Sequence, residues 1–385
     1  MKTIGLDGSR AFLKYRTGIE EYSYQVIKHL RDYLTESQVR LYVRKKLRFR
    51  QGRLIFVYPE IDFSLPPNWE LCGIWAPRFW TQLGLSLQML FRPVETLFVP
   101  AHTLPLIGGK RNVVTVHGLE YEVSPESYGF WERLYMRYSI RYSCWKADTV
   151  IAVSENTKKD LIKLYDVVEE KTQVVYEGYR QELTADSVKI IGESEHPSAD
   201  NYQLPAKSYV LFIGRIEERK NVSRIIEAFE LLKERYAIPH QLVLVGKTGY
   251  GYQSVKCKMQ NAKFKDDIQE LGYVTNKEKG QLLANASAFI FPSLYEGFGL
   301  PILEAQSYGI PVVTSCLSSL PEVGGEGALY ADPYSPTDIA DKLYQALTLT
   351  DEAKIIFQEK MKTNLKQFSW ENCAEDIAQV VDSRR

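Results

Sequence analysis

The stretch Ala288-Phe-Ile-Phe-Pro-Ser-Leu-Tyr-Glu-Gly-Phe-Gly-Leu-Pro-Ile-Leu-Glu-Ala-Gln306 decides the fold. Its apolar opening, residues 288–291, predicts a buried strand that the next proline ends. Pro301 suits the first turn of a helix, where its missing N–H costs nothing, and Leu300 begins the helical pattern. Strand, glycine loop and helix follow in the order typical of α/β proteins. Such a loop offers backbone N–H groups at the positive end of a helix, where an anion can bind.

Two carboxylates bracket this loop, Glu296 before it and Glu304 in the first turn of the predicted helix. Taken by itself, Glu304 could simply stabilise the helix, because a carboxylate near a helix N-terminus interacts favourably with the helix dipole. This role leaves unexplained a second glutamate on the far side of the glycine turn. A bound nucleotide that carries a sugar explains both. The loop would hold phosphate, one glutamate would accept hydrogen bonds from ribose hydroxyls, and the other would accept them from the attached sugar.

At this point the sequence resembles a known family. The resemblance is carried by Glu296-x7-Glu304 around Gly-Phe-Gly-Leu-Pro, by Gly309-Ile-Pro-Val-Val-Thr-Ser315 and by Ser319-Leu-Pro-Glu322. These motifs look like those of the family 4 retaining glycosyltransferases. The resemblance covers nearly the whole chain and is more specific in the second half. It implies the α/β GT-B fold, in which two doubly wound Rossmann-like domains face each other across a cleft.

Composition is compatible with this fold. The chain has 385 residues, of which 45% are hydrophobic and 25% charged, as in ordinary globular proteins of about two domains. No apolar run reaches the roughly 18 residues of a membrane span. The first residues lead directly into a predicted strand, so we expect no signal peptide. The five cysteines are scattered and lack C-x-x-C spacing, which argues against a zinc site or a disulfide framework. Such cysteines are typical of a reducing compartment such as the cytoplasm.

Charge is unevenly distributed although the formal net charge is zero. Residues 1–180 carry an excess of six positive charges and the remainder an excess of six negative charges. Seven basic residues and no acidic residue lie between Arg40 and Arg53. A solvated face is the simpler explanation. The alternative is peripheral contact with the cytoplasmic face of a membrane that carries a lipid-linked acceptor.

Alternating strand and helix patterns divide the chain. We expect an N-terminal, acceptor-side domain over residues 1–178 and a polar linker over 179–207. The C-terminal domain, over 208–366, would bind the nucleotide sugar. The resemblance implies that the last segment, 367–385, is a helix that crosses back to the first domain.

In the first half, His102 and His117 end two predicted strands, where doubly wound sheets bind ligands. A structural hydrogen-bonded histidine is the commoner case. Gly18 lies between the first strand and helix, where a simple turn is the commoner explanation of a glycine. The resemblance implies that Gly18 faces the donor phosphates and that His117 hydrogen-bonds the transferred sugar. Where the family often has Asn-Gly, this chain has Glu177-Gly178, which leaves the local contacts there open.

In the second half, Gly214 and Arg215 follow a predicted strand, and Lys220 precedes a helix. Solvation is the usual explanation of a surface cation, and the alternative that two cations at such a place indicate is a diphosphate clamp. The resemblance implies base recognition near Gly272 and Val274. It also implies a donor site made by Gly18, Gly214, Arg215, Lys220, Gly272, Val274, Glu296, Gly297, Phe298, Gly299, Leu300 and Glu304.

The reaction implied is transfer of a hexose, with mannose as a candidate, from a nucleotide diphosphate sugar to a hydroxyl of a glycan or lipid-linked acceptor. The anomeric configuration would be retained, with His117, Glu296, Arg215 and Lys220 as catalytic residues. The chain has no Asp-x-Asp, so we expect neither a metal requirement nor a separate cofactor. We expect no nucleic acid partner. The alternatives are a non-catalytic nucleotide-sugar-binding relative, and an epimerase or phosphorylase of the same fold.

Overall fold

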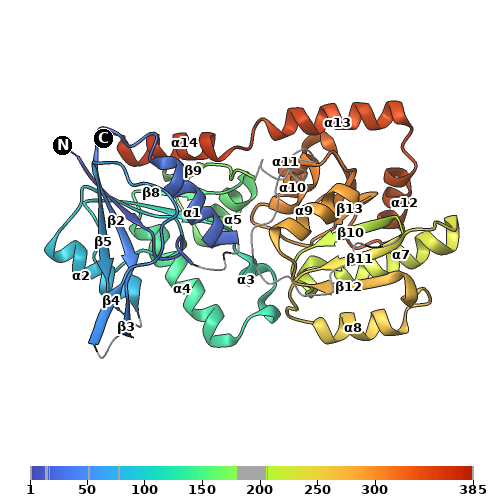
Figure 1. Ribbon diagram of the computed structural model, residues 1–385, viewed down its shortest axis with the longest axis horizontal. Coiled ribbons are helices and arrows are strands. Elements are labelled where there is room, and N and C mark those ends of the chain that lie inside the picture. Colours follow the sequence, from blue (N-terminus) through green and yellow to red (C-terminus); the bar gives the residue numbers. More distant parts are fainter. Residues whose placement is uncertain are drawn as a thin grey trace. The chain divides into compact units, whose positions relative to one another are not determined.

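The chain forms two compact units, one made by residues 1–178 and 368–385 and the other by residues 179–367. The structure, a computed structural model (Figure 1), describes residues 2–13, 16, 18–50, 53–76, 79–179, 205 and 207–383. The predicted linker, 179–207, lies almost entirely outside the described residues.

Unit 1 is built on a parallel sheet of seven strands in the order β5-β2-β1-β6-β7-β8-β9. Chain order starts at the inner strand β1, runs outward to β5, and then restarts at β6 on the other side of β1. This reversal defines a doubly wound sheet. The strands are β1 (Thr3–Asp7), β2 (Gln38–Arg44), β5 (Trp69–Ile74), β6 (Thr96–Val99), β7 (Arg111–Val116), β8 (Thr149–Ala152) and β9 (Thr172–Val174).

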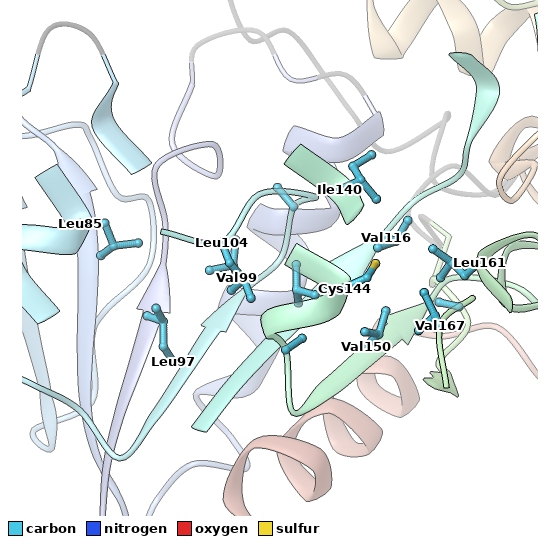
Figure 2. Close-up of a cluster of buried hydrophobic side chains, with 14 of the residues drawn as sticks. Leu85, Leu97, Val99, Leu104, Val116, Ile140, Cys144, Val150, Leu161 and Val167 are labelled. Atoms are coloured by element: carbon cyan, nitrogen blue, oxygen red, sulfur yellow. The ribbon is translucent and has the colours of Figure 1, made fainter. Parts of the chain in front are cut away.

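Helices cover both faces of this sheet. They are α1 (Gly18–Leu30), α2 (Ser86–Phe91), α3 (Glu120–Val123), α4 (Phe130–Lys146), α5 (Glu155–Tyr165) and α14 (Trp370–Asp382). Figure 2 shows the core on one face, where Val116 and Val150 meet Ile140 and Cys144 of α4. Side chains alternate along a strand, so Thr115 points to the opposite face, where it meets Tyr22 of α1 at 3.3 Å.

The last helix, α14, packs against α1 within unit 1. Arg111 of β7 donates to the carbonyl oxygen of Val380 at 2.7 Å and so anchors its end. At the start of α14 the chain passes close to Gly178. A Cβ at Gly178 would lie 2.3 Å from the backbone nitrogen of Trp370, so the close approach requires a glycine.

Two strands of unit 1 stand apart from the sheet. β3 (Lys46–Arg50) and β4 (Arg53–Val57) form an antiparallel hairpin, paired only with each other among the described strands (Figure 1). The basic segment predicted over 40–53 is therefore divided between the central sheet and this hairpin.

Unit 2 repeats the doubly wound plan with six parallel strands, in the order β12-β11-β10-β13-β14-β15. The strands are β10 (Tyr209–Ile213), β11 (Gln241–Val245), β12 (Ile268–Gly272), β13 (Ala288–Phe291), β14 (Val312–Ser315) and β15 (Ala328–Ala331). The helices are α7 (Val222–Tyr236), α8 (Tyr252–Asn261), α9 (Asn276–Asn285), α10 (Leu300–Ser307), α11 (Leu320–Gly324), α12 (Pro336–Leu347) and α13 (Asp351–Leu365). Every residue of β11, β13 and β14 is buried, as expected for a parallel sheet covered on both faces.

The strand predicted at 288–291 is observed as β13. The apolar periodicity of residues 336–347 predicts a helix, and it is observed as α12. Three predictions differ from the structure. The apolar spacing that begins at Ile19 predicts a helix to about Leu34, whereas α1 ends at Leu30. The strand expected at 174–176 lies at Thr172–Val174. Where we expected only a short final helix, two helices end the chain, α13 and α14. None of the described helices is long and apolar enough to cross a bilayer.

Candidate active site

The carboxyl ends of three neighbouring strands of unit 2 are joined by backbone hydrogen bonds. The N–H of Gly214, after β10, donates to Val245 at the end of β11 over 2.9 Å, and the N–H of Gly246 donates to Gly272 at the end of β12 over 2.8 Å. Gly246 has a φ of +144°, and a Cβ there would lie 1.8 Å from the carbonyl oxygen of Gly214. Only glycine permits this approach. These hydrogen bonds place Gly214 and Gly272, both of which were predicted to be site residues, at one edge of the sheet.

Lys220 and Glu296 form a buried ion pair at the same edge. Lys220 ends the turn that follows β10, and Glu296 lies in the loop that follows β13. Because β10 and β13 are adjacent strands, the two side chains meet, with Nζ 2.5 Å from Oε1 and side-chain exposures of 12% and 10%. The chain order reverses between these two strands, which is where doubly wound sheets bind their ligands.

Arg219 supplies a second cation to the same carboxylate. Its Nη1 lies 3.3 Å from Oε2 of Glu296, and its Nη2 contacts Glu217 at 2.9 Å. Burial alone would raise the pKa of the Glu296 carboxyl, but Lys220 and Arg219 outweigh it and hold that pKa below its ordinary value. Glu296 is therefore an ionised hydrogen-bond acceptor and not a reservoir of protons.

Arg215 differs from its neighbours in exposure. Its side chain is 66% exposed, and its Nε lies 3.5 Å from Oε2 of Glu217. Such a pair in solvent is weak, so the guanidinium can turn to an anionic ligand at little cost. Arg215 and Lys220 thus flank one turn, the first accessible and the second fixed.

The backbone of the Glu296 loop is held by two serines that follow β14. Ser318 Oγ accepts from the N–H of Glu296 at 2.8 Å, and Ser319 Oγ donates to the carbonyl oxygen of Phe298 at 2.5 Å. Gly299 follows with a φ of +128°, which disfavours any side chain, and α10 begins at the next residue. The loop that leads to the start of this helix consists of Gly297, Phe298 and Gly299, and Leu300 is the first helical residue.

Glu304 of α10 forms an ion pair with a lysine of the neighbouring helix. Lys279 of α9 places its Nζ 2.5 Å from Glu304 Oε1, and the two side chains are 17% and 16% exposed. The second oxygen of this carboxylate can still accept hydrogen bonds from a ligand.

Gly272 and Val274 lie between β12 and α9. Gly272 adopts a φ of +67°, so its peptide groups are turned out of the strand conformation. Between the two residues Tyr273 is exposed, with Lys247 Nζ 4.9 Å from its ring centre. The loop thus offers backbone polar groups and an aromatic face.

His117 lies in unit 1, just beyond β7, and is buried. Its Nε2 is 2.9 Å from the carbonyl oxygen of Pro100, and its Nδ1 is 3.1 Å from Glu177 Oε1. A carbonyl oxygen can only accept, so Nε2 carries a proton. To bind a sugar through its ring, His117 would have to release one of these partners.

Gly18 is the first residue of α1 and is exposed. No described atom lies within 4 Å of where its Cβ would be, so packing does not require a glycine there. The predicted contact of Gly18 with donor phosphates remains a prediction.

Four further residues complete these clusters and were not identified from the sequence as site residues: Glu177, Glu217, Arg219 and Lys279. Glu177 could have been identified from the sequence, because it stands where the family often has asparagine. Arg219 and Glu217 lie in the run Arg215 to Lys220, where adjacent residues of both charges do not reveal which side chains turn inward. No sequence feature points to Lys279, because only the packing of α9 beside α10 brings it to Glu304.

Solved structures share this architecture. A sucrose-phosphate synthase from Thermosynechococcus elongatus superposes with a TM-score of 0.72 at 18% identity, over 99% of this chain and 98% of the other. HepE from Anabaena, solved in complex with UDP and glucose, superposes with a TM-score of 0.68 at 17% identity, over the full length of both chains. The fold is therefore GT-B, as predicted.

Sequence comparison identifies the family. The family described as "Glycosyltransferase Family 4" matches residues 16–182, and "Glycosyl transferases group 1" matches residues 198–368. The O-antigen chain mannosyltransferase B of Escherichia coli is 33% identical over 264 residues, which cover 69% of this chain and 68% of that protein. The O-antigen chain mannosyltransferase RfbU of Salmonella typhimurium is 26% identical over 83% of this chain and 84% of its own. The chain belongs to the family 4 glycosyltransferases and is a hexosyltransferase.

Proposed function

We propose that this protein transfers a mannosyl group from a nucleotide diphosphate mannose to a hydroxyl of a growing glycan or lipid-linked saccharide, with retention at the anomeric carbon. The observation that carries the proposal is the Lys220–Glu296 pair, with Arg219 beside it, where the strand order of unit 2 reverses. Two relatives named as O-antigen chain mannosyltransferases support the choice of sugar and acceptor. The free, scattered cysteines support a cytoplasmic location.

The diphosphate is the leaving group, and its developing charge needs stabilisation. Arg215 and Lys220 flank one turn, and α10 begins directly after the loop that contains Glu296. Cations and oriented N–H groups of this kind stabilise charge that develops in a transition state. In this proposal they act without a divalent metal, which is consistent with the absence of Asp-x-Asp from the sequence.

The two glutamates have separate roles in the proposal. Glu296, kept ionised by two cations, accepts hydrogen bonds from the sugar and fixes its orientation. Glu304 accepts from the ribose hydroxyls through the oxygen that Lys279 leaves available. Gly272 to Val274 contact the base through their backbone, and Gly18 and His117 of unit 1 contact the donor phosphates and the transferred sugar.

The first experiment is a thermal shift of the protein with UDP, GDP, ADP, CDP and TDP in the absence of metal. A ligand at 100 times its dissociation constant stabilises by roughly 2.7 kcal/mol, which is easily measured. We expect one diphosphate to stabilise the protein and the effect to be lost in Glu304→Ala and Lys220→Ala. No response to any of the five would contradict the donor site.

A turnover assay distinguishes an active transferase from a protein that only binds the donor. With the matching nucleotide mannose and an O-antigen oligosaccharide, we expect release of nucleotide diphosphate and an α-linked product by NMR, because such donors are α-linked. EDTA should leave the rate unchanged. Loss of turnover with EDTA and recovery with Mg²⁺ or Mn²⁺ would disprove metal independence, and donor binding without release would indicate a non-catalytic relative.

A further inference from the structure

The hairpin of β3 and β4 carries an exposed apolar face that its register defines. Leu47 is paired with Phe56 and Phe49 with Leu54, and alternate positions of a strand point to opposite faces. These four side chains therefore share one face. They are 40%, 50%, 73% and 65% exposed, in the order Leu47, Phe56, Phe49 and Leu54. A lone hairpin with such a face is marginally stable in water and prone to association unless something covers it.

The other face of the hairpin carries cations beside Ile55 and Val57. Lys46 and Arg48 alternate with the apolar residues of β3, and Arg53 opens β4. These three side chains are exposed, and none forms an ion pair within the described part of the chain. The sequence has no aspartate or glutamate from Ser37 to Pro59. The positive charge of the hairpin is thus not neutralised by its own segment.

The rest of the basic segment behaves differently. Arg40 donates to the carbonyl oxygen of Arg92 at 3.0 Å and lies 3.6 Å from Glu70. The Arg44 guanidinium lies 5.6 Å from the Trp80 ring centre. Both therefore stabilise the unit itself. Lys45 Nζ lies 4.3 Å from the ring centre of Phe56. Among the described basic side chains of this segment, those of Lys46, Arg48 and Arg53 have no such contact and remain available to a partner.

We propose that the β3–β4 hairpin docks unit 1 on an anionic lipid bilayer. The side chains of Leu47, Phe49, Leu54 and Phe56 enter the boundary between headgroups and acyl chains, and Lys46, Arg48 and Arg53 contact lipid phosphates. Trp75, whose ring lies 6.2 Å from that of Phe56 and is half exposed, sits at the rim, as aromatic residues do at membrane interfaces.

Charge and polarity favour the bilayer over other partners. A second copy could cover the apolar face with its own, but it would leave the cations of the opposite face without a partner of opposite charge. Nucleic acid would use the cations but leave the apolar face in water. A lipid surface with anionic headgroups satisfies both faces at once. The proposal is independent of the donor site, because every residue named lies in unit 1.

The test is co-sedimentation of the full chain with vesicles of phosphatidylcholine alone or with phosphatidylglycerol. We expect binding only to the anionic vesicles, weakening as salt rises. Lys46→Gln, Arg48→Gln and Arg53→Gln together should lower the binding constant about 100-fold, at about fivefold for each cation. Phe49→Ser with Leu54→Ser should also lower binding at least about tenfold.

Matched controls come from unit 2. Ile355 and Ile356 of α13 are 61% and 57% exposed, so Ile355→Ser with Ile356→Ser removes comparable apolar surface. We expect these variants to bind vesicles as the wild type does, and all variants to keep the nucleotide diphosphate thermal shift. The proposal is overturned if the wild type ignores anionic vesicles or if hairpin and control variants bind equally. It is also overturned if Phe49→Ser with Leu54→Ser instead abolishes a dimer seen by light scattering.

Discussion

Each unit of this protein holds a buried acid–base pair at the carboxyl edge of its sheet, and the two pairs differ in what surrounds them. In unit 2, Lys220 and Glu296 meet at 2.5 Å beside a second cation, Arg219. In unit 1, His117 and Glu177 meet at 3.1 Å, and the other ring nitrogen bonds to a carbonyl oxygen. In the first pair two cations face one carboxylate, whereas in the second the carboxylate faces a single imidazole ring.

Disruption of the unit 2 pair should have the largest effect. Lys220→Met leaves Glu296 buried with one cation, so we expect a loss of about 3 kcal/mol in the free energy of unfolding. Transfer should slow at least about 100-fold, because a donor to the leaving diphosphate is removed. Urea unfolding followed by circular dichroism and steady-state rates measure the two effects.

The double variant sharpens this prediction. If the cost comes from an uncompensated carboxylate, Lys220→Met with Glu296→Gln should be more stable than Lys220→Met alone. Equal stability of the two would show that the contact contributes through packing and not through charge.

The unit 1 pair should tolerate a neutral partner better. Glu177→Gln retains an oxygen that can accept from His117, so we expect a loss below about 1 kcal/mol, whereas Glu177→Ala should cost about 2 kcal/mol. All six tryptophans lie in residues 1–178 and 368–385, so their fluorescence reports on unit 1. An alanine variant as stable as the glutamine variant would contradict the role given to this hydrogen bond.

Acid should weaken unit 1 through His102. Burial, with His117 and Arg10 nearby, lowers the pKa of His102 well below its ordinary value of 6.5. The unfolded chain therefore binds a proton that the folded chain does not, and stability falls as pH drops below about 6.5. The slope approaches about 1.4 kcal/mol per pH unit for one proton.

Tryptophan-detected urea unfolding at pH 7.5, 6.5 and 5.5 measures this slope, and His102→Gln should reduce it. Glu296 differs, because its lowered pKa stabilises the folded state above the ordinary value of 4.5, and that stability is lost only at lower pH. A slope between pH 6.5 and 5.5 that persists in His102→Gln would assign it to another group.

The smallest effect is expected at Lys279. Its contact with Glu304 is partly exposed, and such pairs contribute less than about 1 kcal/mol. Lys279→Met should weaken nucleotide diphosphate binding about threefold by titration calorimetry, because the carboxylate loses its fixed orientation. A loss as large as that in Glu304→Ala would instead make Lys279 a direct ligand.

Much of the fold could be read from the sequence because local signals agreed with the tertiary structure. Residues 288–306 contain a strand, a glycine loop and a proline at the helix start, and each of these features appears where expected. The hairpin of β3 and β4 was missed because its cations obscured the alternation of apolar residues. Helix α13 was missed because its exposed isoleucines, Ile355 and Ile356, blur its amphipathic pattern.

The sequence by itself determined the order of strands and helices, the glycines at 246 and 299, and the carboxylates that bracket the loop after β13. These depend on periodicity and on backbone conformations that only certain residues adopt. Only the tertiary structure decided which charges meet. Lys220 and Glu296 are 76 residues apart and pair because adjacent parallel strands bring their following loops to one edge. Lys279 and Glu304 are 25 residues apart and pair because α9 and α10 bring them together. The same packing enclosed His117 with Glu177 and left the cations of the hairpin exposed, since burial is a property of the assembled sheet and its helices.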